Sequence, residues 1–168
     1  LLTLVFELTV FGAFTRLTDS GLGCPDWPGC YGSASPVGAK GHIEAAQTAM
    51  PTGPVTHSKA WVEMIHRYLA TAVGVLILTL AAATWRYRQA PGGAQSSTFT
   101  VGLAWPVFTL IWVCVQGAFG ALTVTMKLFP AIVTLHLLGG LILLALLCVQ
   151  AVRYQQAADN TWPVAVSP

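Results

Sequence analysis

Two histidines, His66 and His136, are the residues whose type and setting point most clearly to chemistry. Each lies a few residues inside a long apolar segment, about 8–9 Å below the expected start of a helix at 1.5 Å per residue. If both helices enter a membrane from the same side, the imidazoles share one depth. Two imidazoles at one level on neighbouring helices suit the two axial positions of a haem iron. The alternative is that each histidine only hydrogen-bonds across a helix interface.

Two charged residues accompany the first histidine. Glu63 precedes His66 by three residues, so both side chains project from one face of the same helix. A carboxylate at the mouth of an apolar pocket is a functional candidate, and it could accept a proton. Arg67 could form a local ion pair with Glu63, or it could contact an anionic group such as a haem propionate. A further acid, Glu7, lies inside the first apolar run, where a carboxylate is costly, and receives no role.

Two cysteines lie between the first and second apolar segments. Cys24 and Cys30 fall in a stretch rich in glycine and proline, and an oxidising compartment permits a disulfide or a redox-active pair there. A zinc site would need His42 and His57 as further ligands, but their spacing fits no standard site. The sequence has no Cys-x-x-Cys-His motif, which excludes covalent attachment of a c-type haem.

The composition indicates a membrane protein. Of the 168 residues, 55% are hydrophobic and 8% are charged, whereas a soluble domain carries about 25% charged residues. The net charge of +2 is small and scattered, so no nucleic-acid partner is expected.

Four apolar segments predict an all-α membrane protein, a bundle of four transmembrane helices. In lipid each segment must be helical, because open backbone groups find no water to bond. The last three reach the roughly 20 residues needed to span a bilayer, whereas the first is shorter. We therefore expect a first helix clipped at its N-terminus, in a fragment of a longer protein. The expected helices cover residues about 1–15, 61–85, 99–124 and 128–152, with a long loop over 16–60.

Basic residues predict the orientation of these helices. Arg86 and Arg88 precede a short Gly/Pro turn, and Arg153 follows the fourth segment. Short basic loops stay in the cytoplasm, so the loop 16–60 and the turn at Lys127 should face outward. We expect a multi-pass protein of the bacterial inner membrane, with a disordered polar tail after Arg153.

Three blocks of sequence resemble the haem A synthase family (CtaA/COX15), in its N-terminal half. Residues 12–32 (GAFTRLTDSGLGCPDWPGCYG) resemble the signature of the family's first loop. Residues 63–70 (EMIHRYLA) resemble its second-helix motif. The stretch 116–130 (QGAFGALTVTMKLFP), which leads into 134–140 (TLHLLGG), resembles its third and fourth helices.

The resemblance implies a fold and an activity. Family members have eight transmembrane helices in two pseudo-symmetric halves, each with its own histidine pair. They oxidise a methyl group of haem O to the formyl group of haem A, which terminal oxidases receive. The resemblance assigns His66 and His136 to the iron of haem b or haem O and Glu63 to catalysis. It assigns Cys24 and Cys30 to an outward-loop pair with a redox role. Haem O synthase and terminal oxidase assembly factors are the implied partners.

Two other functions remain open at this level. One is a b-type electron carrier, with two histidines on a haem and no substrate turnover. The other is a structural subunit in which both histidines bridge helices. A simple carrier would require neither Glu63 nor the Cys24/Cys30 loop, so these features separate it from an oxidising enzyme.

Overall fold

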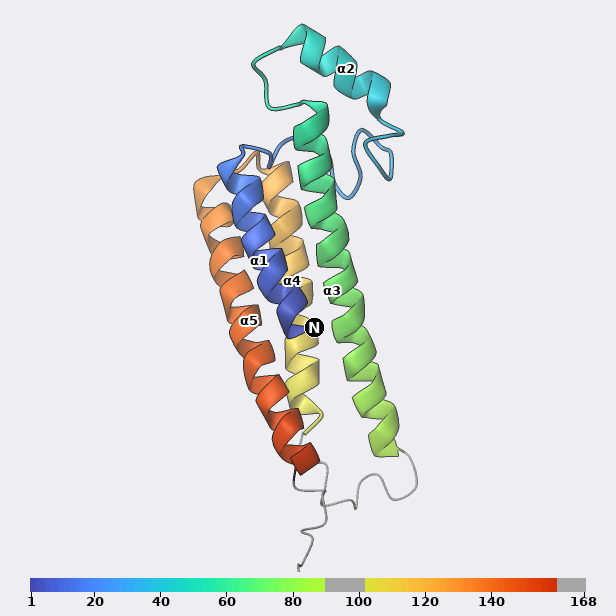
Figure 1. Cartoon of the computed structure of the whole chain (residues 1–168), viewed down its shortest axis with the longest axis vertical. Coiled ribbons are helices and arrows are strands. Elements are labelled where there is room, and N and C mark those ends of the chain that lie inside the picture. The colour runs from blue at the N-terminus through green and yellow to red at the C-terminus, as the bar shows by residue number, and fades with distance from the viewer. Residues whose placement is uncertain (90–101, 160–168) are drawn as a thin grey trace, which may run out of the picture.

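The fold is entirely helical over the residues that the structure, a computed structural model, describes: 1–89 and 102–159 (Figure 1). The helices are α1 (Leu2–Leu17), α2 (Lys40–Ala49), α3 (His57–Gln89), α4 (Ala104–Thr125) and α5 (Pro130–Asp159). The predicted all-α class is therefore confirmed.

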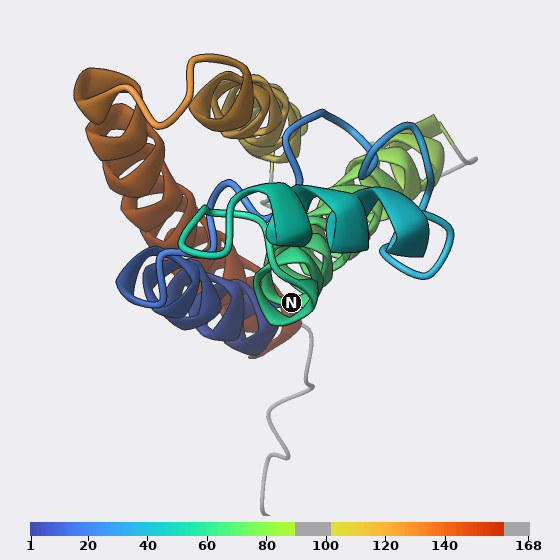
Figure 2. The same ribbon diagram turned by 90° about the horizontal axis from the view of Figure 1, so that it is seen from above.

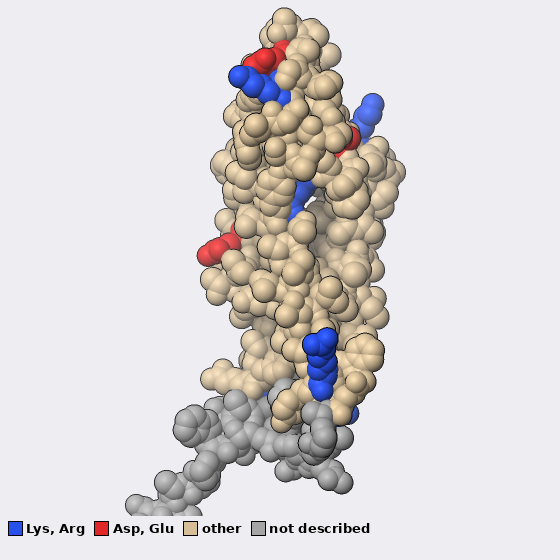
Figure 3. Space-filling view, turned by 90° about the vertical axis from the view of Figure 1, so that its right-hand side faces the viewer, with Lys and Arg blue, Asp and Glu red and all other residues tan. Residues whose placement is uncertain are grey.

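Three of the described helices are long and apolar enough to cross a membrane: α3, α4 and residues 130–156 of α5. The fourth, α1, has 16 residues, which make roughly 24 Å of helix against a hydrocarbon core of about 30 Å. The chain is thus an integral membrane protein, while a count of four spanning helices is not established. On the face drawn in Figure 3, charged side chains are sparse between the two ends, where one acidic side chain protrudes at mid-height from the left edge.

Helices α1, α3, α4 and α5 stand side by side and form a ring (Figures 1 and 2). Both α1 and α4 pack against α3 and against α5. The two helices that carry the histidines, α3 and α5, are therefore diagonal partners. The expectation that these two helices are neighbours was wrong, because α1 and α4 lie between them on either side. Side chains of α3 and α5 that point inward face each other across the centre of the ring.

Two apolar cores lie above and below that centre. The loop-end core joins α2 and the loop that contains Cys24 and Cys30, called the cysteine loop below, to the first turns of α3. Its buried members are Cys24, Cys30, Ala39, Ile43, Ala60 and Met64. The bundle core joins α1, α3 and α5 farther along; its buried members are Val5, Val73, Ile77, Leu143 and Leu147. His66 follows Met64 and precedes Val73 on α3. The histidine layer thus lies between two regions that exclude water.

The helix bounds differ from the sequence expectation at their polar ends. Helix α3 begins at His57 and ends at Gln89, and α5 continues to Asp159 through residues expected to form a tail. The guanidinium carbon of Arg153 on α5 lies 4.5 Å from the ring centroid of Trp105 on α4, and this cation–π contact favours ordered helix there. The Gly/Pro turn after α3 and the residues from 160 onward lie outside the described residues.

Helix α2 was not predicted, because the whole stretch 16–60 was expected to be a loop. Its stability comes from tertiary contact: Ile43 is fully buried in the loop-end core. A Lys40–Glu44 pair at 3.8 Å on the exposed face contributes little. Short helices are marginal without such packing, so the sequence pattern alone could not reveal it.

This origin of α2 predicts that Ile43→Ala releases the helix without unfolding the bundle. Truncating a buried isoleucine costs about 2–5 kcal/mol, which is enough to open a short helix locally. Hydrogen-exchange mass spectrometry in nanodiscs should show exchange over residues 40–49 accelerated by roughly tenfold or more. The control is Val37→Ala, since Val37 is 70% exposed. Equal exchange over 40–49 in both variants would contradict this account.

Candidate functional site

The two imidazoles project into the ring from opposite helices. His66 of α3 and His136 of α5 are both half-buried, and their charges would influence each other. His66 lies parallel to the ring of Phe11 on α1, with centroids 6.2 Å apart and planes 13° apart. The sequence prediction that both histidines face one region is consistent with this arrangement.

The ring nitrogens distinguish a ligand from a helix bridge. Nδ1 of His66 and Nδ1 of His136 are buried without a hydrogen-bond partner in the described part of the chain. The Gln116 main chain approaches His136 without a hydrogen bond of good geometry to Nδ1. Buried polar atoms are nearly always paired, so a purely structural pair of histidines would bridge helices here. His66 forms no such bridge among the described residues, whereas the main chain of Gln116 on α4 lies within reach of the His136 ring on α5. The observation therefore argues against the structural reading at His66.

Glycines near the histidines fall into two groups. At Gly139, one turn beyond His136, an added Cβ would collide with the side-chain amide of Gln116 on α4. The carbonyl of Gly139 accepts a hydrogen bond of 2.9 Å from Trp112 Nε1. Gly139 therefore serves close packing of α4 on α5. At Gly74 and Gly140 an added Cβ meets nothing within 4 Å, so these glycines leave open space.

Glu63 lies one turn from His66, toward the cysteine loop, and is 4% exposed. Its Oε2 accepts a hydrogen bond of 2.7 Å from the backbone N–H of Cys24. Its Oε1 accepts one from Nη2 of Arg67, so the local ion pair foreseen from the sequence is present. Both carboxylate oxygens accept and neither donates, which is the pattern of an ionised carboxylate.

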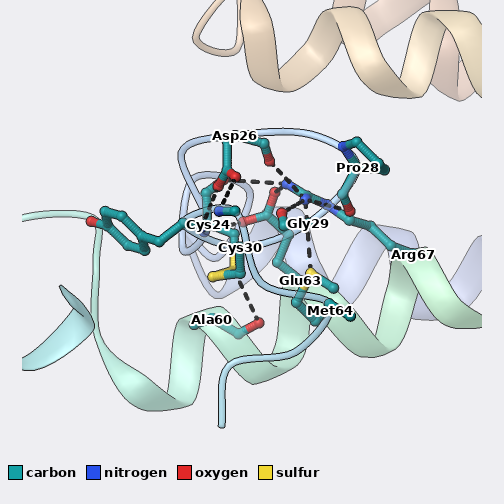
Figure 4. The surroundings of a disulfide bond; sticks show 12 residues. Cys24, Asp26, Pro28, Gly29, Cys30, Ala60, Glu63, Met64 and Arg67 are labelled. Carbon is teal, nitrogen blue, oxygen red and sulfur yellow. Dashed lines mark hydrogen bonds and ion pairs between the residues drawn. A yellow bond between two sulfur atoms is a disulfide. The ribbon is translucent and has the colours of Figure 1, made fainter. Parts of the chain in front are cut away.

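Arg67 also donates hydrogen bonds to backbone carbonyls of the cysteine loop (Figure 4). Its Nη1 lies 2.8 Å from the carbonyl oxygen of Asp26 and 2.5 Å from that of Gly29, and its Nη2 lies 3.2 Å from that of Cys24. Only 11% of its side chain is exposed. These bonds occupy the ends of the guanidinium. A contact between Arg67 and a haem propionate stays a prediction, and nothing in this arrangement supports it.

The cysteine loop is closed by a disulfide between Cys24 and Cys30, and both residues are fully buried (Figure 4). Inside it, the Asp26 carboxylate accepts hydrogen bonds of 2.6 and 2.7 Å from the N–H groups of Tyr31 and Gly32. The disulfide rules out the zinc alternative, because the thiolates are not free. Of its other candidate ligands, His42 stacks on Tyr31, and the ring of His57 is 3.7 Å from Glu44.

Three residues of this site were missed from the sequence: Phe11, Gly12 and Gly120. They lie on α1 and α4, which carry no titratable group next to the histidines. The available signal was a glycine within each apolar helix at the depth of the histidines. Glu7, by contrast, is exposed on α1, one turn before Phe11.

The bonds of Arg67 predict that Arg67→Gln loosens the cysteine loop. The variant loses the loop carbonyls and leaves Glu63 buried without its cation, which is strongly destabilising. After the free thiols Cys114 and Cys148 are blocked, a water-soluble phosphine should reduce Cys24–Cys30 about tenfold faster or more. Reduction is read by a maleimide gel shift.

The matched control is Lys59→Gln, which removes the exposed 3.0 Å ion pair between Lys59 and Asp19 at the same end of the bundle. Exposed pairs contribute little, so its rate should equal that of the unsubstituted chain. Equal rates for Arg67→Gln and Lys59→Gln would show that the guanidinium does not secure the loop.

Comparison with known proteins identifies relatives of this chain. It is 42% identical over 154 residues to a heme A synthase of Shewanella oneidensis. That match covers 90% of this chain and 43% of the Shewanella protein. Heme A synthases of Caulobacter sp. strain K31 and Lysinibacillus sphaericus are 31% and 30% identical, over 84% and 87% of this chain and 37% and 40% of those proteins.

The chain thus spans about two fifths of the length of the curated relatives that it matches. No solved structure matches it. The sequence profile of the cytochrome oxidase assembly proteins, the COX15-CtaA family, matches residues 1–166. The chain therefore belongs to the COX15-CtaA family of cytochrome oxidase assembly proteins.

Proposed function

We propose that this chain forms the substrate-binding half of a haem A synthase, an oxidoreductase that converts a methyl group of haem O to the formyl group of haem A. The observation that carries the proposal is a pair of inward-facing imidazoles, His66 and His136, on diagonal helices, with the ionised carboxylate of Glu63 one turn away. The names of the relatives from Shewanella oneidensis and Caulobacter support the same activity.

The residues present fit an iron porphyrin. Within the described residues, Nδ1 of each imidazole is fully buried without a hydrogen-bond partner. In this proposal the other nitrogen of each ring, Nε2, would bind the metal.

In this proposal His66 and His136 would hold the iron of the haem, and that iron would supply the redox centre for oxidation of the haem O methyl group. The two apolar cores, one on each side of the histidine layer, would exclude water from the site. Glu63 takes up a proton on the loop side, next to His66. General acid–base groups of this kind contribute about 10²–10⁴ in rate.

The setting of the site in the cell also belongs to the proposal. Arg86 and Arg88 lie in the last turn of α3, and Arg153 lies near the same end of the bundle. The positive-inside rule then puts the cysteine loop on the outer side of a bacterial inner membrane. A disulfide is stable in that compartment. Haem O synthase would supply the substrate, and assembly factors of terminal oxidases would receive the product.

The catalytic role of Glu63 predicts that Glu63→Gln abolishes haem A formation while haem is still bound. The experiment uses a chimera in which this chain replaces the matched region of the Shewanella oneidensis relative, so that the remaining length is supplied. It is expressed with a haem O supply in a host without its own haem A synthase. Chromatography of extracted haems should show a roughly 100-fold or greater loss of haem A in Glu63→Gln.

The control is Glu44→Gln, which removes an exposed acid on α2 and should leave haem A formation unchanged. Haem A at the unsubstituted level in Glu63→Gln would eliminate the catalytic role. A chimera that binds haem through both histidines and yields no haem A would favour an electron carrier over an oxidising enzyme.

A further inference from the structure

Each histidine of the site rests on a glycine of a neighbouring helix. A Cβ built at Gly12 of α1 would lie 3.0 Å from Cε1 of His66, 3.6 Å from its Nε2 and 3.8 Å from its Nδ1. A Cβ built at Gly120 of α4 would lie 3.4 Å from Cε1 of His136 and 3.8 Å from its Nε2. In both cases the atom nearest the added Cβ is Cε1, the ring carbon between the two nitrogens.

The contact between Gly12 and His66 is tighter than the contact between Gly120 and His136. A contact of 3.0 Å to carbon is well inside ordinary van der Waals separation, about 3.5–4.0 Å between carbon atoms. The ring therefore has to move if a methyl group appears at position 12. Phe11 stacks parallel to the same ring, so α1 restrains both a face and an edge of the His66 imidazole. At Gly120 the corresponding distance approaches an ordinary contact.

Other glycines of these helices do not behave in this way. At Gly117, one turn before Gly120 on α4, and at Gly74 on α3, an added Cβ meets nothing within 4 Å. A general need for small residues between membrane helices would not distinguish Gly120 from Gly117. The contact with the His136 imidazole distinguishes them, because only Gly120 has it.

We propose that Gly12 and Gly120 are positioning residues that set the planes of the two imidazoles toward the iron, with Gly12 exerting the stronger control. The inference rests on the proposed function. An axial imidazole binds through Nε2, so a displaced ring edge tilts the nitrogen lone pair away from the metal. Groups that orient a metal-bound histidine typically change metal affinity by about 10–100-fold. Here the orienting element is the absence of a side chain on the facing helix.

The test uses the 168-residue chain in nanodiscs, reconstituted with ferric haem b. Gly12→Ala should release haem to excess apomyoglobin roughly tenfold faster or more. It should also shift the largest g value of the low-spin electron paramagnetic resonance signal, which reports the orientation of the imidazole planes. Gly120→Ala should show the same changes to a smaller extent. Gly117→Ala, the matched control, should equal the unsubstituted chain in both measurements.

A second variant keeps the test decisive if Gly12→Ala fails to fold, as judged by circular dichroism. That variant is Gly120→Ala, whose added Cβ would lie 3.4 Å from the nearest atom of His136 and therefore disturbs the packing less. The inference is overturned if Gly12→Ala, or Gly120→Ala where Gly12→Ala does not fold, matches Gly117→Ala in release rate and g values. If the unsubstituted chain gives no low-spin signal of two imidazoles, the proposed function fails, and the inference fails with it.

Discussion

The ion pair of Glu63 and Arg67 is the interaction on which the arrangement of this molecule depends. Both side chains are nearly buried, 5% and 11% exposed. Charges removed from water are tolerated only when they are paired and when their remaining hydrogen-bonding positions are filled. The cysteine loop fills them: the N–H of Cys24 reaches Glu63, and loop carbonyls surround the guanidinium of Arg67. The loop therefore folds so that its backbone groups hydrogen-bond to both charged side chains, and the Cys24–Cys30 disulfide closes the loop in that conformation.

This constraint connects the outer loop to the chemistry below it. Glu63 and Arg67 occupy successive turns of α3, and His66 lies between them in sequence, so the helix that fixes the loop also fixes the first imidazole. The second imidazole comes from α5 across the ring, with the bundle core beneath both. The site is thus closed above by a loop that a buried charge pair holds and below by aliphatic packing. A buried carboxylate, two imidazoles and two apolar cores are thus brought together at the loop end of the bundle.

The sequence predicts much of this fold because lipid leaves few alternatives. Apolar runs must be helical, so α3, α4 and α5 follow from hydropathy, and counting residues from the helix starts puts His66 and His136 at one depth. The three-residue spacing of Glu63 and His66 predicts their common face. What the sequence could not predict depends on tertiary contacts. Helix α2 exists because Ile43 finds a core, and Arg67 finds carbonyls only once the loop has folded. The contacts of Gly12 and Gly120 with the imidazoles appear only when four helices are arranged as a ring with α3 and α5 diagonal.

The most direct test of the central claim is the axial ligation of the iron. Near-infrared magnetic circular dichroism of the ferric haem-loaded chain reports the identity of both axial ligands. The account predicts the charge-transfer band of two imidazoles, and its replacement by a high-spin spectrum in His66→Ala and, separately, in His136→Ala. A bis-imidazole band that survives either substitution, or a band from any other ligand pair in the unsubstituted chain, would contradict it.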